Sequence, residues 1–135
     1  MKEQATQSYL SYSIAPESHL MRSHWLMGDD SNSYREGMLQ LCEQVSQKMI
    51  VRLLYHVSSY YSPDASDQKW ILEEFFPLLA QTKLRRIAVV ITWDVFLQTV
   101  AEELCRKSID VFEGSIRMKT FHDAQSAEDW LLAGG

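Results

Sequence analysis

The sequence predicts an α/β domain with a mixed β-sheet of about five strands and about four helices. Three observations lead to this prediction: two N-terminal segments alternate apolar and polar residues, two later segments are almost continuously apolar, and amphipathic segments with helical spacing separate and follow them. Alternation is typical of strands with one buried face, and continuous apolar runs are typical of strands covered on both faces. We therefore expect an antiparallel N-terminal hairpin beside a set of parallel core strands, with helices over the sheet.

The first two strands are predicted to form the hairpin. Leu10, Tyr12 and Ile14 alternate with serines, and a second alternating run covers residues 20–27. Residues 15–18 between the two runs read Ala-Pro-Glu-Ser, which is typical of a turn. The two runs should therefore pair as antiparallel strands.

The first helix should begin near Tyr34 and lead into a buried strand. Ser33, with Glu36 three residues later, predicts a capping box at the helix start. Apolar residues then recur at helical spacing as far as Met49, which predicts one stripe against the sheet. Residues 50–57 are a short and almost wholly apolar run, so we expect a central strand there.

The middle of the chain predicts a second helix and the clearest strand. Residues 58–67 are polar and are expected to form a loop, and an amphipathic stretch that includes Trp70 follows it. Pro77 lies inside this helix and has no amide proton, which predicts a kink or an early end. Residues 86–92 form a continuous apolar run of the kind found in the middle of parallel sheets.

The last part of the chain predicts a third helix, a further strand and a closing helix. Asp94 is expected to cap a helix whose apolar residues recur at helical spacing from Phe96 to Leu104. Residues 116–121 predict the strand, and Asp123 can cap the closing helix. Strands that alternate with helices in this way predict parallel pairing.

The length and charge of the chain exclude several classes of protein. Its 135 residues fit one domain, residues 1–135, which can bury roughly two thirds of its surface. The 13 Lys and Arg residues against 18 Asp and Glu residues give a net charge of -5, which disfavours nucleic-acid binding. No apolar stretch approaches the roughly 18 residues of a membrane span, and the first thirty residues hold no apolar leader segment. We therefore expect a cytoplasmic protein.

No motif predicts a catalytic, cofactor-binding or metal site. The chain has no P-loop, no GxGxxG and no GxSxG nucleophile elbow, and its four histidines share no metal-ligand spacing with one another or with cysteine. Cys42 and Cys105 lack CxxC spacing and fall on the apolar faces of predicted helices. They are expected as small buried hydrophobic residues in a reducing compartment.

Several segments together resemble one family. The segments are WLMG at 25–28, DQKW at 67–70, FFP at 75–77, RRIAVV at 85–90, and residues 121–131, which end in AEDWL. Through them the chain from about Leu10 to Leu131 resembles the small bacterial STAS-like proteins, which have the SpoIIAA-like, or anti-sigma-factor-antagonist, fold. Tryptophan, proline and apolar positions carry the resemblance, so it implies the fold rather than an activity.

The resemblance also implies a candidate phosphoacceptor. Anti-sigma-factor antagonists carry a phosphorylated serine directly after an aspartate, at the start of a helix. The matching stretch here, residues 63–67, reads Pro-Asp-Ala-Ser-Asp, which makes Ser66 the candidate. A serine at a helix start is also a common N-cap, so a purely structural role for Ser66 is the alternative.

A candidate interaction surface lies in three predicted loops. Ligands of open α/β sheets bind beyond the carboxyl ends of the strands, where these loops should lie. Their aromatic, hydroxyl and acidic residues are a mixture typical of an interaction surface or a shallow ligand site. The candidate residues are Ser58, Tyr60, Tyr61, Asp64, Ser66, Asp67, Trp93, Asp94 and His122. For most of the acids, helix capping is the simpler alternative.

These features predict a non-enzymatic regulatory or protein-interaction module with a protein partner. The alternative is a binder of a small apolar or amphiphilic ligand, because many Trp, Met and Phe residues surround a sheet whose helices can part. The open strand edge of the hairpin also favours self-association as a homodimer. An enzyme is the third hypothesis and rests only on the loop residues.

Overall fold

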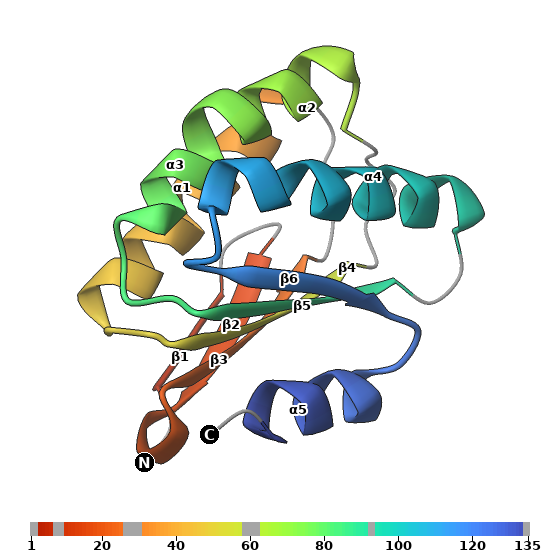
Figure 1. Cartoon of the computed structure of the whole chain (residues 1–135). Helices are drawn as coiled ribbons and strands as arrows, with labels where there is room; N and C mark the ends of the chain where they lie inside the picture. The colour runs from red at the N-terminus through yellow and green to blue at the C-terminus, as the bar shows by residue number, and fades with distance from the viewer. Residues whose placement is uncertain (1–2, 7–9, 26–30, 58–62, 92–93, 134–135) are drawn as a thin grey trace.

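The computed structural model describes residues 3–6, 10–25, 31–57, 63–91 and 94–133, and these contain one mixed sheet of six strands. The strands are β1 (Glu3–Thr6), β2 (Leu10–Ala15), β3 (Leu20–Trp25), β4 (Arg52–Val57), β5 (Arg86–Ile91) and β6 (Arg117–Phe121). They lie in the order β1-β2-β3-β4-β5-β6 (Figure 1). Strands β1 to β3 pair antiparallel and strands β3 to β6 pair parallel, which confirms the predicted fold class.

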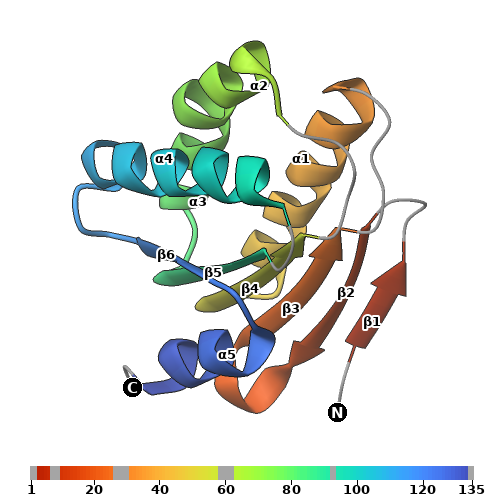
Figure 2. The ribbon, with the colours of Figure 1, turned by 90° about the vertical axis from the view of Figure 1, so that its right-hand side faces the viewer.

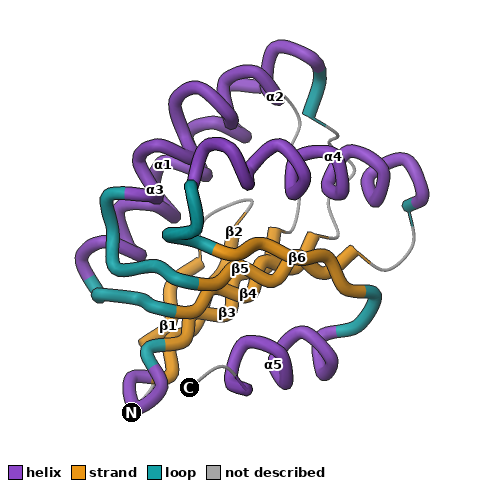
Figure 3. The backbone as a smooth tube through the Cα atoms, viewed as in Figure 1, coloured by secondary structure: helices purple, strands orange, loops and turns teal. Residues whose placement is uncertain are grey.

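Helices cover both faces of the sheet. Those described are α1 (Ser31–Gln47), α2 (Ala65–Trp70), α3 (Phe76–Ala80), α4 (Val95–Phe112) and α5 (Ala124–Ala133). Helices α1 to α4 lie over one face and α5 lies over the other (Figure 1 and Figure 2), so the strands form the middle layer in Figure 3. From β3 to β6 the strands are neighbours in the order of the sequence. Right-handed crossovers therefore place every connecting helix on the same face.

The predicted hairpin is confirmed, with one more strand at its edge. Ile14 in β2 pairs with Met21 in β3 in antiparallel register, and a short 3-10 helix, Pro16–Ser18, makes the turn. Strand β1 pairs antiparallel with β2. The sequence does not predict β1 because its residues, Glu-Gln-Ala-Thr, lack an alternating apolar pattern.

Helix α1 begins at Ser31, three residues before the predicted start. Ser33 is therefore the third residue of the helix and not its N-cap, so the predicted capping box is wrong. Residues 31–33 read Ser-Asn-Ser, and both residue types are common N-caps, so the sequence pattern does not choose among the three positions. The predicted stripe is buried from Tyr34 to Val45, but Met49 lies beyond the helix end with an exposed side chain.

Pro77 does not end the second helical segment early, because a π-helical turn precedes it. Helix α2 continues through the π-helical segment Ile71–Phe75 directly into α3, and Pro77 is the second residue of α3. The amide of Phe76 donates to the carbonyl of Ile71, five residues earlier. This wider turn accommodates a residue that has no amide to donate, and the helix runs on to Ala80.

Two arginines of the sheet hold the C-terminal end of α5. Arg52 in β4 and Arg86 in β5 are register partners. Arg52 Nε donates to the carbonyl of Leu131 at 3.0 Å, and Arg86 Nη1 donates to the carbonyl of Trp130 at 2.6 Å. The last carbonyls of a helix lack partners within it and carry partial negative charge. Both guanidinium groups therefore stabilise this end of α5.

Candidate functional site

Five of the nine candidate loop residues lie within the described part of the chain. They are Asp64, Ser66, Asp67, Asp94 and His122, whereas Ser58, Tyr60, Tyr61 and Trp93 lie outside the described residues. Asp64 is the N-cap of α2, because its carboxylate accepts from the amide of Asp67 at 2.8 Å. Asp94 caps α4 by accepting from the amide of Leu97 at 3.1 Å. Both acids therefore have the capping role that the sequence offers as the alternative.

Asp67 is fully buried and forms an ion pair between two helices. Arg35 Nε of α1 donates to one carboxylate oxygen of Asp67 at 3.0 Å, and the side chain of Asp67 is 0% exposed. The other carboxylate oxygen accepts from the amide of Asp64 at 3.3 Å, which completes a capping box. The guanidinium of Arg35 also lies 5.5 Å from the ring centroid of Trp70. Asp67 therefore joins α1 to α2 and is not available at the surface.

Ser66 is exposed and also contacts Arg35. Its hydroxyl oxygen accepts from Arg35 Nη2 at 3.0 Å. Ser66 is the second residue of α2, whose N-cap is Asp64, so the alternative role of Ser66 as an N-cap is wrong. A neighbouring guanidinium favours a phosphate through charge-assisted hydrogen bonds. Phosphorylation of Ser66 stays a prediction.

His122 is exposed after β6 and contacts the beginning of α4. Its Nδ1 lies 3.4 Å from Nε2 of Gln98, which also donates to the carbonyl of Ile91 at 3.4 Å. Gln98 thus links the carboxyl ends of β5 and β6 to α4. His122 therefore has a structural contact in addition to its exposed position.

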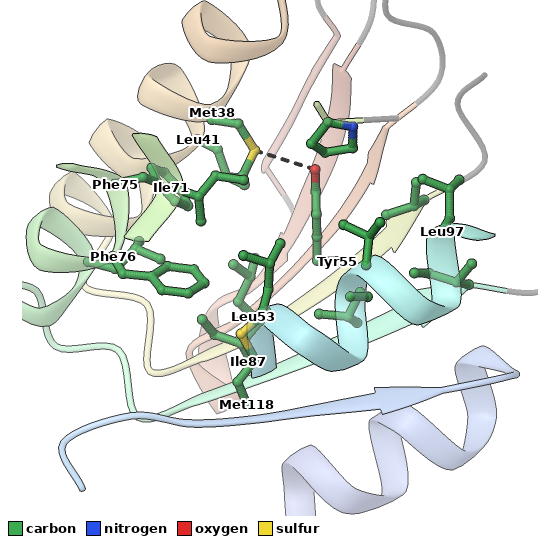
Figure 4. A pocket seen from close by; sticks show the side chains of 18 of the residues that line it. Met38, Leu41, Leu53, Tyr55, Ile71, Phe75, Phe76, Ile87, Leu97 and Met118 are labelled. Atoms are coloured by element: carbon green, nitrogen blue, oxygen red, sulfur yellow. Dashed lines mark hydrogen bonds between the residues drawn. The ribbon is translucent and has the colours of Figure 1, made fainter. Parts of the chain in front are cut away.

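An apolar cavity of about 80 Å³ lies between the sheet and helices α1 to α4. Its lining comes from α1, the π-helical segment, α3, α4 and the facing side of β4 to β6. Figure 4 labels ten of the lining residues: Met38, Leu41, Leu53, Tyr55, Ile71, Phe75, Phe76, Ile87, Leu97 and Met118. Val57, Pro63 and Ile91 also line the cavity, so it reaches the carboxyl ends of β4 and β5.

The cavity lining is almost free of polar groups. None of the described lining residues is charged, and the hydroxyl groups among them belong to Tyr34 and Tyr55. Water needs several polar partners to occupy a cavity, whereas an apolar cavity of roughly 150 Å³ stays dry and binds benzene. A dry space of about half that volume accommodates a group of a few carbon atoms, including the end of a longer molecule.

An apolar molecule that enters this space gains van der Waals contacts with its lining. The sequence does not predict the cavity, because Tyr34, Met38 and Ile71 have the spacing of ordinary helix core residues and the space depends on the distance between layers.

A second, polar groove of about 400 Å³ lies on the other face of the sheet, beside α5. Its lining includes Ser11, Ser13, Arg22, His24, His56 and Glu128. The rings of His24 and His56 stack with centroids 4.6 Å apart, and burial, together with the charge of His24, lowers the pKa of His56. Arg22 forms an ion pair with Glu128 at 2.6 Å. A polar, solvated face is the ordinary pattern for strands of an antiparallel hairpin.

The described residues form neither a metal cluster nor a reactive thiol. No three His, Cys, Asp or Glu side chains among them lie close enough to hold a metal ion. Cys42 and Cys105 are free cysteines, the first buried and the second half-buried. Burial, together with the nearby Glu102, raises the pKa of the Cys105 thiol to about 12, and burial raises the pKa of Cys42. Both thiols are therefore protonated at neutral pH, which makes them weak nucleophiles.

None of the helices in the described part of the chain combines the length and apolar character needed to cross a bilayer. Compared with protein families, with curated proteins and with solved structures, the chain shows no match. The function is therefore inferred from the side chains and spaces of this chain alone.

Proposed function

We propose that this protein is a non-enzymatic module that binds a small apolar molecule in the cavity between its sheet and helices α1 to α4. The observation that carries the proposal is the cavity, which is apolar, has a volume of about 80 Å³ and reaches the carboxyl ends of β4 and β5. Ligands of open α/β sheets bind at this edge. A mostly apolar lining with a few polar groups is typical of small-molecule sites.

The ion pair between Arg35 and Asp67 supports the proposal because it braces the helices beside the cavity. Tyr34, next to Arg35 in α1, and Pro63, just before α2, both line the cavity. The ion pair therefore fixes α1 and α2 to each other beside the cavity.

Binding is testable with cyclopentane and protein labelled with ¹³C at the methionine methyl groups. The resonances of Met38 and Met118, which line the cavity, are expected to shift and saturate during the titration. Met49 is 53% exposed and lies outside the cavity, so its resonance should not shift in the same way. The resonances of Met38 and Met118 should shift because the ligand changes the contacts of their methyl groups. Nuclear magnetic resonance measures all three residues in one sample.

A filled cavity provides the control for this experiment. Ala101→Leu places a larger side chain at a lining position of α4 that is 8% exposed, and it should abolish saturable binding while the fold is retained. Ala133→Leu makes the same change at an exposed position of α5, on the other face of the sheet, and should bind like the wild type. Saturable shifts that persist in Ala101→Leu, or that never occur in the wild type, contradict the proposal.

We propose a protein-interaction module at the same edge of the sheet as the second candidate function. Its support is an exposed apolar pair at the start of α4, where Val95 is 73% and Phe96 is 64% exposed. Phe96 and Leu97 both belong to the apolar positions predicted at helical spacing, but only Leu97 is buried, so the prediction is wrong for Phe96. Neighbouring exposed apolar side chains favour contact with a partner, either another protein or a second copy of this chain. The STAS-like resemblance and the cytoplasmic location stay predictions.

A photo-crosslinking amino acid at position 96 tests the second candidate in the source cells. We expect one adduct of defined mass, and an adduct of twice the chain mass indicates a homodimer. Position 109 is the matched control, because Ile109 is 68% exposed near the other end of the same helix. If both positions give the same adducts, or if position 96 gives none, the start of α4 is not a specific interaction surface. Mass spectrometry of the adducts gives the result.

A further inference from the structure

The hydroxyl of Tyr55 is an unusual group in the wall of the cavity. Tyr55 lies in β4 between Leu53 and Val57, and all three side chains line the cavity. The phenol donates a hydrogen bond to Sδ of Met38 in α1 at 3.3 Å, as the dashed line in Figure 4 shows. Burial raises the pKa of Tyr55 above its ordinary value, and a hydrogen bond with Tyr34 acts in the opposite direction. Tyr55 therefore stays a neutral donor.

The acceptor that Tyr55 uses is a poor one. A thioether sulfur accepts hydrogen bonds only weakly, whereas a carbonyl oxygen accepts them well. A hydroxyl taken from water into an apolar site loses free energy unless it finds a good partner. The Tyr55 proton therefore gains from any oxygen acceptor that enters the cavity and replaces Met38 Sδ.

The charge of the ligand also follows from the lining. No cationic side chain is among the described residues that line the cavity. A carboxylate or phosphate placed there finds no counter-charge among these described residues, and an unpaired buried charge is strongly disfavoured. A neutral acceptor avoids this cost and still satisfies the phenol.

We propose that the ligand of the cavity is a neutral molecule with an apolar body and one accepting oxygen, such as a ketone or an ester, and that this oxygen takes the hydrogen bond of Tyr55 from Met38. The inference rests on the proposed function, because it assigns a ligand class to the same cavity. Tyr55 orients the ligand, and the aliphatic and aromatic lining binds its body. This division of roles is typical of small-molecule sites.

Two probes of matched shape test the proposal. Cyclopentanone carries an oxygen where methylenecyclopentane carries a methylene group, so the change in their affinity ratio when the Tyr55 hydroxyl is removed isolates the hydrogen bond. We expect the ratio of ketone affinity to alkene affinity to fall about fivefold to tenfold in Tyr55→Phe, as the loss of one hydrogen bond implies. Tyr12→Phe removes a hydroxyl from β2, outside the cavity lining, and should keep the wild-type ratio.

The outcomes separate this inference from the proposed function. Affinities come from the shifts of the Met38 and Met118 methyl resonances. If Tyr55→Phe keeps the wild-type ratio of ketone affinity to alkene affinity, the ligand class is wrong while the cavity remains a binding site. If neither probe binds the wild type, the proposed function fails and this inference fails with it. A ratio that falls only in Tyr55→Phe supports both.

Discussion

Arg35→Ala is expected to lower the free energy of unfolding by about 3 kcal/mol, because it leaves a buried carboxylate without its guanidinium. The side chain of Asp67 is 0% exposed, so its charge cannot reach water when Arg35 is removed. The substitution also removes the hydrogen bond to Ser66 and the contact with the Trp70 ring. Urea unfolding of the variant and the wild type measures the difference.

The two partners of the ion pair should respond unequally. The side chain of Arg35 is 31% exposed, so in Asp67→Ala the guanidinium can turn to water, and we expect a smaller loss of about 2 kcal/mol. The double variant should lose less than the sum of the single losses, by about 1 kcal/mol or more, because the partners contact each other. An equal or larger loss in Asp67→Ala contradicts this account of the buried charge.

Arg106→Ala is the matched control for the ion pair. Arg106 pairs with Glu103 on the surface of α4, where the two side chains are 67% and 43% exposed. Exposed pairs contribute little, so the free energy of unfolding should stay close to that of the wild type. If Arg106→Ala lowers the free energy of unfolding as much as Arg35→Ala does, the effect comes from replacing an arginine and not from leaving a buried charge unpaired.

The strands β2 to β6 and the order of the elements can be predicted from the sequence, because the burial of a strand determines the order of apolar and polar residues along it. In β2, Tyr12 is half-buried and Ile14 is buried on one face, whereas in β5 the run from Ile87 to Ile91 is buried on both faces. Helix starts are less well determined: α1 begins at Ser31 within three consecutive residues that all suit an N-cap. Strand β1 leaves no apolar pattern, so only the pairing with β2 reveals it.

The candidate site follows from the sequence only in part. Rules of local chemistry identify Asp94 as a cap and offer capping as the alternative for Asp64, and the structure shows both roles. The ion pair of Arg35 with Asp67 joins residues 32 positions apart, and the sequence pattern places Arg35 on the solvent side of its helix. The cavity cannot be predicted from the sequence, because its volume depends on the distance between the helix layer and the sheet. Local sequence patterns contain no information about that distance.

Leu131→Ala is expected to lower the free energy of unfolding by about 3 kcal/mol, because Leu131 fixes α5 to the sheet. Its side chain is 0% exposed and packs in the cluster of Leu20, Leu54, Ala88, Val90 and Ala127. The substitution removes apolar contacts but keeps the backbone carbonyl that accepts from Arg52. The decrease in the free energy of unfolding therefore measures the side-chain packing and not the hydrogen bond with Arg52. Urea unfolding followed by tryptophan fluorescence measures it.

Leu132→Ala separates this packing from a change in helix propensity. Leu132 is the next residue of α5 and is 46% exposed, so the same substitution there should change the free energy of unfolding by about 0.5 kcal/mol or less. Equal losses in both variants contradict the role of Leu131. An isolated helix of ten residues is barely stable in water, so α5 depends on this contact and on the two arginines for its structure. Because the apolar cavity lies on the opposite face, Leu131→Ala should weaken the fold without changing the ratio of ketone affinity to alkene affinity.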